Sequence, residues 1–119
     1  MEKTPKAYIA ANKDIFLNDL FDKLRIPSIS SQSEHKPDME RMALHWRDYL
    51  LQSGMQKAEV FPTAGNPIVY AERIIDPKAK TILIYGHYDV MPVEPLELWK
   101  SAPFEPEVRE GHIWARGNN

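Results

Sequence analysis

The sequence predicts a mixed α/β fold in which two amphipathic helices precede a hydrophobic central strand. In the first half of the chain, apolar residues recur every three or four positions, and the pattern then becomes strand-like. The five-residue run Thr81–Tyr85 carries no charge, which favours a strand that is covered on both faces. Near the end, Glu110-Gly111 divides an alternating segment, which indicates a hairpin.

The first helix is predicted to run from Thr4-Pro5 to about Arg25. Threonine can accept a bond from the free N–H groups of a first turn, and proline already has a near-helical φ. Ile26-Pro27-Ser28 should end this helix, because proline disfavours helical geometry in the residue before it. The apolar stripe consists of Ile9, Phe16, Leu17, Leu20, Phe21 and Leu24.

A second helix is predicted after the polar stretch Ser28–Pro37, which we expect to be an exposed loop. Asp38 is the expected N-cap, and Gly54 lies where a left-handed residue ends many helices. The apolar stripe of this helix consists of Met39, Met42, Ala43, Trp46, Tyr49 and Leu50.

Strands are predicted at Ala58–Phe61, Ile68–Ile75 and Thr81–Tyr85, which are rich in β-branched and aromatic residues. A buried helical segment is the alternative for the last run, but its β-branched content and Gly86 favour a strand. The hairpin should occupy Val108–Ala115. Because no helix follows to cover the second face of the sheet, we expect an incomplete domain.

Composition narrows the function classes. Among 119 residues, 15 Lys and Arg stand against 17 Asp and Glu, so a nucleic-acid module is disfavoured. The chain has no cysteine, which excludes disulfides and thiolate metal sites and leaves histidine and carboxylate as ligand types. No apolar run approaches the ~20 residues of a spanning helix, so no membrane role is indicated and a cytoplasmic location is the expectation.

The candidate site is the pair His87 and Asp89, directly after the predicted strand Thr81–Tyr85. Residues two apart in extended chain point to the same side, and ligands gather beyond the carboxyl ends of strands. A carboxylate can orient an imidazole toward a metal, so His87 is the candidate ligand and Asp89 its partner. A purely structural hydrogen-bonded pair is the alternative, although Gly86 favours close approach of a ligand. Because a catalytic zinc needs about three protein ligands, this is half a site.

The other candidates have weaker support. His35 is expected to be solvated in the polar loop, His45 to lie at a surface or boundary position, and His112 to need no special role. The serines form no Gly-x-Ser-x-Gly elbow, and the glycines form no phosphate loop. Core packing is the alternative to a pocket role for three aromatic residues, Trp99, Phe104 and Trp114.

Four segments closely resemble the M20 family of metallopeptidases, within it the branch of carnosinase-type and cytosolic non-specific dipeptidases. These segments are Gly86–Val93, Leu98-Trp99, Pro103–Pro106 and Gly111–Gly117. The resemblance implies that residues 1–119 are the amino-terminal portion of a catalytic domain with an α/β/α sandwich fold. It also implies an inserted lid domain, absent here, which often mediates dimerisation.

For the site, the resemblance implies hydrolysis of dipeptides or short peptides by a water between two zinc ions, or manganese in some members. By position, His87 matches a metal ligand and Asp89 the aspartate that holds its ring. Arg116-Gly117 matches the pair ahead of a metal-bridging aspartate, which would follow Asn119, whereas Asn118 stands where alanine is usual. Residues 1–119 alone are therefore expected to be inactive.

Two other functions stay open at this point. A non-catalytic interaction domain would recruit a partner through its open sheet edge or face. An amino-acid deacylase of the same family would share the His-x-Asp block. The spacing of Leu98-Trp99 and Pro103–Pro106 favours the dipeptidase.

Overall fold

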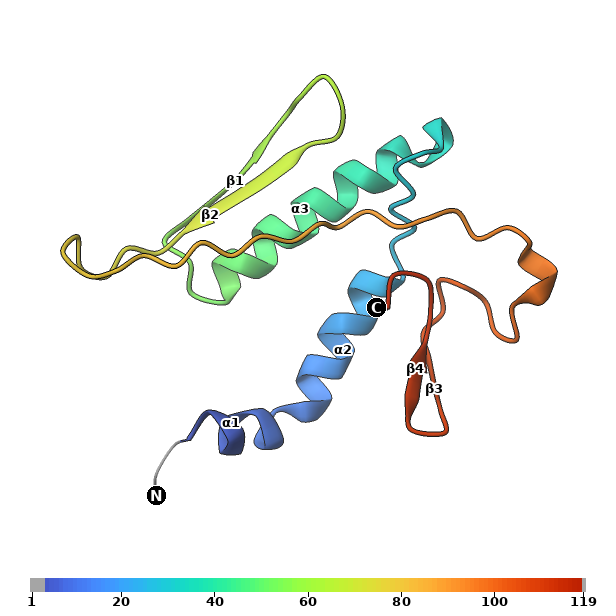
Figure 1. The fold of residues 1–119 in the computed structure, drawn as a ribbon, viewed down its shortest axis with the longest axis horizontal. Coiled ribbons are helices and arrows are strands. Elements are labelled where there is room, and N and C mark those ends of the chain that lie inside the picture. Colours follow the sequence, from blue (N-terminus) through green and yellow to red (C-terminus); the bar gives the residue numbers. More distant parts are fainter. Residues whose placement is uncertain (1–3, 119) are drawn as a thin grey trace.

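The computed structural model describes residues 4–118 and confirms a mixed α/β chain (Figure 1). Three helices come first and two antiparallel hairpins follow, β1 paired with β2 and β3 with β4. The elements are α1 (Pro5–Ala11), α2 (Lys13–Leu24), the 3-10 turn η1 (Ser33–His35), α3 (Lys36–Gln52), β1 (Lys57–Phe61), β2 (Ile68–Glu72), the 3-10 turn η2 (Leu96–Leu98), β3 (Glu107–Arg109) and β4 (His112–Trp114).

The amino-terminal helix starts as predicted, but it is broken into α1 and α2. The Thr4 hydroxyl accepts a hydrogen bond from the Ala7 N–H, with Pro5 in the first turn. The break lies at Asn12, whose side-chain amide donates to the Tyr8 carbonyl at 2.9 Å. Because asparagine can bond nearby backbone groups in this way, it competes with helix continuation. The prediction of one continuous helix was therefore wrong at this residue.

Helix α3 packs against the β1–β2 hairpin, and both were predicted in outline. The helix starts at Lys36, so Asp38 lies in its first turn and the N-cap prediction was wrong. Gly54 follows the helix with φ 102°, as expected. A small core joins α2, α3, β1 and the segment after α2. It consists of Leu24, Ile29, Met39, Met42, Ala43 and Ala58.

The segment Ser28–Pro37 is only in part the exposed loop that its polarity predicts, because its first residues are buried while Ser31 and Ser33 are exposed. Ser28 and Ile29 are 0% and 2% exposed, and Ile29 forms a parallel β-bridge with Val90. From Ser33 onward the segment is already helical, first as η1 and then as the start of α3. Composition misleads at the start of the segment because the hydroxyl groups of Ser28 and Ser30 bond to the Tyr88 carbonyl and the Asp89 carboxylate.

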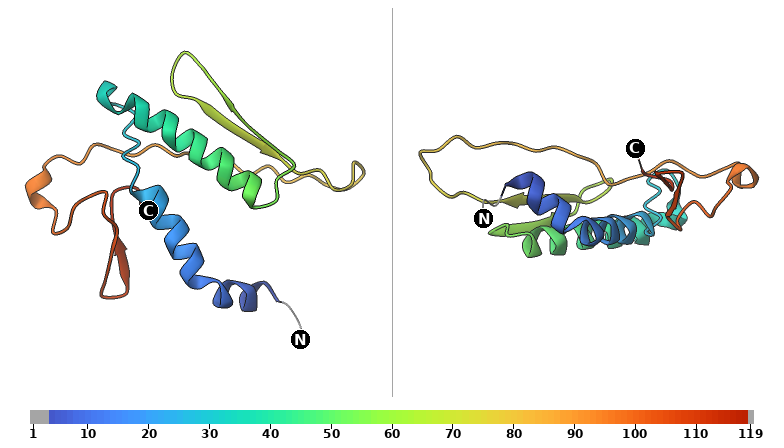
Figure 2. Two further views of the ribbon diagram at one scale, coloured as in Figure 1. Left: turned by 180° about the vertical axis from the view of Figure 1, so that it is seen from behind. Right: turned by 90° about the horizontal axis from the view of Figure 1, so that it is seen from below.

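Thr81–Tyr85 was predicted to be a covered central strand, and within residues 4–118 it forms no strand and is exposed. Ile82, Leu83, Ile84 and Tyr85 expose 84–90% of their surfaces. The segment passes in front of α3 in Figure 1, but Figure 2 shows it bowed away from the helical layer. The total accessible surface is 9471 Å², against about 6600 Å² for a compact monomer of this mass. Within residues 4–118, no strand pairs with this run and no layer covers it, so the α/β/α sandwich is incomplete among the described residues.

The predicted hairpin is confirmed, with a two-residue turn between β3 and β4. Glu110 and Gly111 have φ values of 51° and 76°, which is the left-handed pair of a type I′ turn. In the part of the chain that the structure covers, no helix is long and apolar enough to cross a membrane.

Gly117 ties the end of this hairpin to the strand-end segment. Its φ is 88°, and a Cβ built on it would lie 2.7 Å from Cγ1 of Val90. Glycine is therefore required here both for backbone conformation and for space. The close approach brings residues 115–118 beside the segment that carries His87 and Asp89.

A polypeptide of residues 1–119 should bind a hydrophobic dye such as ANS and self-associate with rising concentration. The exposed run Ile82–Tyr85 provides an unpaired apolar strand-like edge, which promotes such association. Combining Ile82→Lys with Ile84→Glu keeps the net charge and should reduce both signals. The matched control combines Ile9→Lys with Ile15→Glu, since both side chains are 57% exposed outside the run. Dye fluorescence and light scattering measure the outcome, and a monomeric parent that binds no dye would contradict it.

Gly117→Ala should destabilise the protein by about 1–3 kcal/mol, because it adds left-handed strain and a clash with Val90. Gly65→Ala is the control. A Cβ on Gly65 would lie 3.8 Å from the Thr63 hydroxyl oxygen, an ordinary contact, so its effect should stay within about 0.5 kcal/mol. Chemical denaturation of both variants tests the difference, and equal midpoints would show that the close approach is unimportant.

Candidate functional site

The site is built where the segment after α2 pairs with the segment after the exposed run. The Val90 N–H donates to the Ser28 carbonyl at 2.9 Å, and the Ser28 hydroxyl donates to the Tyr88 carbonyl at 2.7 Å. Together with the Ile29–Val90 bridge, these bonds join residues 60 positions apart. They hold the backbone on which His87 and Asp89 are placed.

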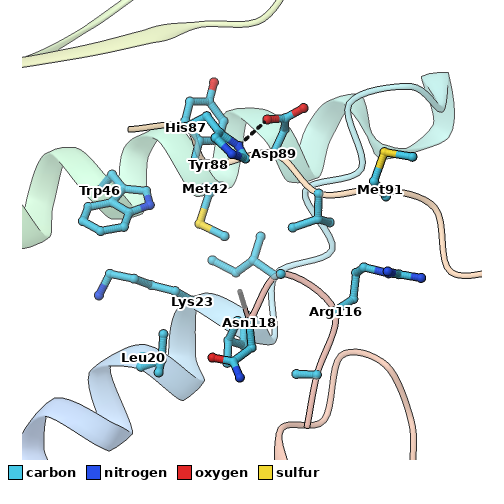
Figure 3. Close-up of a pocket in the computed structure, with 15 residues that line it drawn as sticks. Leu20, Lys23, Met42, Trp46, His87, Tyr88, Asp89, Met91, Arg116 and Asn118 are labelled. Atoms are coloured by element: carbon cyan, nitrogen blue, oxygen red, sulfur yellow. Dashed lines mark hydrogen bonds and ion pairs between the residues drawn. The ribbon is translucent and has the colours of Figure 1, made fainter. Parts of the chain in front are cut away.

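His87 and Asp89 lie side by side, as their spacing predicts. The distance from Nδ1 of His87 to Oδ1 of Asp89 is 2.9 Å, drawn as a dashed line in Figure 3. Their side chains are 63% and 41% exposed, so the pair is accessible from solvent. The second carboxylate oxygen, Oδ2, accepts a hydrogen bond from the Ser30 hydroxyl at 2.6 Å.

The protonation of this group follows from those bonds. The hydrogen bond from Ser30 lowers the pKa of Asp89, burial opposes this, and the bond from His87 lowers the pKa further. An ionised carboxylate can only accept, so Nδ1 of His87 carries the proton that it donates. When such a ring is neutral, its lone pair is on Nε2, and that nitrogen is the one that can bind a metal or substrate.

A pocket of about 330 Å³ opens beside the pair. Leu20 and Lys23 of α2 and Met42 and Trp46 of α3 form one side, and Arg116 and Asn118 come from the chain after β4 (Figure 3). One polar edge, made by the His87–Asp89 pair, therefore meets a largely apolar wall. The remaining lining residues are Leu24, Ile26, Tyr88, Val90, Met91, Ala115 and Gly117.

Lys23 closes the wall between the two helices. Its ammonium lies 3.4 Å from the ring centre of Tyr49 and 5.0 Å from that of Trp46, and it donates to the Asp19 carbonyl at 3.1 Å. Burial lowers the pKa of Lys23, and the nearby Asp19 and Asp22 carboxylates offset part of that effect. In Figure 3 the side chain extends toward Trp46 rather than toward the His87–Asp89 pair. Its charge thus stabilises the packing of α2 against α3 through cation–π contacts.

The other histidines do not join His87. His35, the last residue of η1, pairs with Asp38 of α3 at 2.8 Å, so it is not simply solvated as predicted. His112 donates to the Glu110 carbonyl at 2.9 Å. His45 is half-buried, and its pKa is lowered by burial and by the charge of Lys23. Within residues 4–118, no three His, Asp or Glu side chains gather as a metal site needs.

The three aromatic candidates, Trp99, Phe104 and Trp114, differ in where they lie. Trp99 and Trp114 line a hollow of about 710 Å³ beside β3 and β4, where the Arg116 and Arg109 guanidinium groups lie 4.9 Å and 4.6 Å from their respective ring centres. Phe104 is half-buried and does not line this hollow. The two tryptophans therefore have the pocket placement rather than the core placement.

Sequence patterns missed three residues of the site: Ser28, Ser30 and Lys23. The serines belong to a stretch whose composition predicts solvent exposure, and Lys23 is a charged residue at a buried position. One signal was available, because the apolar Ile29 between two serines fits a half-covered strand better than a loop.

Comparison with known proteins supplies the family. A model of peptidase family M20/M25/M40 matches residues 83–119. The Cys-Gly metallodipeptidase of Candida albicans is 32% identical over 104 residues, covering 77% of this chain and 21% of that protein. A solved di-peptidase structure from Saccharomyces cerevisiae superposes with a TM-score of 0.82 at 27% identity, over 92% of this chain and 26% of that one.

A shorter and more identical match is to a different hydrolase. The succinyl-diaminopimelate desuccinylase of Azoarcus sp. is 50% identical over 40 residues, covering 33% of this chain and 10% of that protein. The chain thus spans about a quarter or less of the length of these relatives. Together with the His87–Asp89 geometry and the matched fold, the comparisons establish that this chain belongs to the M20 peptidase family, and dipeptidases are among the relatives that match most of its length.

Proposed function

We propose that this chain contributes one metal ligand, His87, and its orienting carboxylate, Asp89, to an enzyme that hydrolyses dipeptides or short peptides. The observation that carries the proposal is the 2.9 Å contact between Nδ1 of His87 and Oδ1 of Asp89, on a histidine side chain that is 63% exposed. The dipeptidase relatives support peptides as the substrate class.

The donor set fits a divalent metal ion of the zinc type. A neutral imidazole with its second nitrogen bonded to a carboxylate is a common zinc ligand arrangement. When bound, such an ion supplies Lewis acidity and activates water at neutral pH. The resemblance implies two zinc ions, or manganese in some members, so further ligands must come from outside residues 4–118.

The chain's own residues perform the positioning. Asp89 holds the proton on Nδ1 of His87 and fixes the direction of the ring. The backbone bonds of Ser28 to Tyr88 and Val90 hold the segment that carries both. These hydrogen bonds are formed without a ligand, so the groups that they hold do not have to be ordered during turnover.

The proposal extends to the organisation of the protein. We assign residues 1–119 to the amino-terminal portion of the catalytic domain, with a lid domain that mediates homodimerisation elsewhere. The isolated 119 residues are proposed to be inactive, since one ligand cannot hold two ions. A cytoplasmic enzyme with no role for nucleic acid or membrane stays the expectation from composition.

An amino-acid deacylase is the second candidate, because the 40-residue match to a desuccinylase is half identical. Both reactions cleave an amide and would use the same His-x-Asp unit. Parallel assays of the complete protein with dipeptides and with N-acyl and N-succinyl amino acids separate them. A non-catalytic interaction domain is favoured instead if neither substrate class is hydrolysed with added zinc or manganese.

His87→Ala in the complete protein should abolish metal-dependent hydrolysis and lower the bound metal. Mutation of a residue that only hydrogen-bonds to a metal ligand typically lowers metal affinity or activity by about 10–100-fold. Loss of the ligand itself should therefore lower activity by at least about 100-fold. Elemental analysis and a dipeptide assay measure both effects. The control is His112→Ala, since His112 is also exposed and bonds only a local carbonyl. Unchanged metal stoichiometry in the His87 variant would remove the ligand assignment.

Asp89→Asn should retain part of the metal and lose about 10–100-fold in rate, because a neutral amide orients the ring less strongly and lowers its basicity. The matched control is Asp38→Asn, which alters a second His–Asp pair, the 2.8 Å contact between His35 of η1 and Asp38 of α3. Steady-state kinetics at saturating metal compare the two variants. Near-parental turnover for Asp89→Asn would show that the carboxylate does not orient His87.

A further inference from the structure

Asp89 is anchored on the side opposite His87 by a residue that no motif marks. The Ser30 hydroxyl lies 2.6 Å from Oδ2 of Asp89, while Oδ1 faces the ring. A distance of 2.5–2.7 Å is typical of a hydroxyl bonded to an ionised oxygen, which is the stronger class of hydrogen bond. Each oxygen of the carboxylate therefore has its own partner.

The direction of this bond is determined by chemistry. An ionised carboxylate only accepts, so the Ser30 hydroxyl must donate its single proton to Oδ2. The same bond is the largest influence that lowers the pKa of Asp89. A carboxylate that is held at Oδ2 cannot rotate freely about its last side-chain bond, and Oδ1 is kept toward Nδ1 of His87.

Ser30 itself is held by rigid surroundings. Its neighbour Ile29 is 2% exposed and bridges Val90, and the next residue back, Ser28, is 0% exposed and bonds Tyr88. The Ser30 hydroxyl thus comes from a segment that is largely buried, and Ser30 lies 59 positions from Asp89 in the sequence. Such a preorganised support costs little ordering entropy when the site is used.

We propose that Ser30 is a positioning residue of the proposed enzyme: by holding Oδ2 of Asp89 it fixes the carboxylate that aims His87. This proposal rests on the proposed function of the pair. Ser30 contacts neither the ring nor any atom that reacts, so its effect passes through Asp89 alone. A purely packing role would instead depend on the shape of the side chain and not on its hydroxyl.

The test compares Ser30→Ala with Ser30→Thr in the complete protein, and uses zinc alone as the metal probe. Alanine removes the donor, whereas threonine keeps it. Zinc affinity, measured by competition with a chelator, should weaken about 10–100-fold for alanine and stay within about threefold of the parent for threonine. The turnover number should fall with zinc affinity for alanine, while KM changes little. Ser31→Ala, at the exposed neighbouring serine, is the control.

A second readout needs no metal and no activity. The ring nitrogen NMR shifts of His87 in the metal-free protein report which nitrogen carries the proton. The parent and Ser30→Thr should show protonated Nδ1, and Ser30→Ala should show a mixture of the two tautomers. Thermal unfolding confirms that each variant is folded.

The outcomes decide between roles. Parental zinc affinity and tautomer in folded Ser30→Ala would overturn the proposal, and so would an equal loss in alanine and threonine. If His87→Ala keeps its metal, the proposed function fails, whereas the tautomer readout still judges Ser30. If His87→Ala loses metal and Ser30→Ala does not, only the positioning role fails.

Discussion

The candidate site depends on the pairing of Ser28–Ser30 with Tyr88–Val90. One backbone hydrogen bond, two side-chain hydrogen bonds and one β-bridge connect these two segments, which are far apart in sequence. Ile29 shields this pairing because it is almost fully buried. A hydrogen bond protected from water resists exchange with solvent, so the short pairing can fix the backbone of His87 and Asp89.

The parts of the fold that sequence predicted well are those governed by local chemistry. Thr4-Pro5 starts a helix because threonine caps its first turn and proline has a near-helical φ. Gly54 follows a helix and Gly111 completes a hairpin turn because glycine adopts the left-handed conformation without strain. The long-range parts were missed. A polar stretch at Ser28–Pro37 looks like a loop when its partners, Tyr88 and Asp89, lie some 60 residues away. Spacing placed His87 beside Asp89, but no period points to Ser30.

The run Thr81–Tyr85 shows what a hydrophobic pattern does and does not encode. Its uncharged, β-branched character fits a strand with covered faces, yet Leu83 and Tyr85 are 90% and 88% exposed. Residues 4–118 place no neighbouring strand beside it. The hydrophobic pattern therefore indicates the environment that the segment is suited to, which is a strand with both faces covered. The relatives are about four times longer or more, so they contain further segments that could cover such a strand.

A histidine beside an aspartate is not by itself a site, and a second such pair, His35 of η1 with Asp38 of α3, allows a comparison. His35 and Asp38 lie 2.8 Å apart and are more buried than His87 and Asp89. The other oxygen of Asp38 pairs with Arg41 on the same helix at 3.0 Å, a local ion pair of the kind that contributes little stability. The other oxygen of Asp89 is held by Ser30 from a distant, buried segment. Distance and burial alone would favour the His35–Asp38 pair. Anchoring from a distant segment is the property that sets the His87–Asp89 pair apart, and it is the reason why we propose that pair as the site.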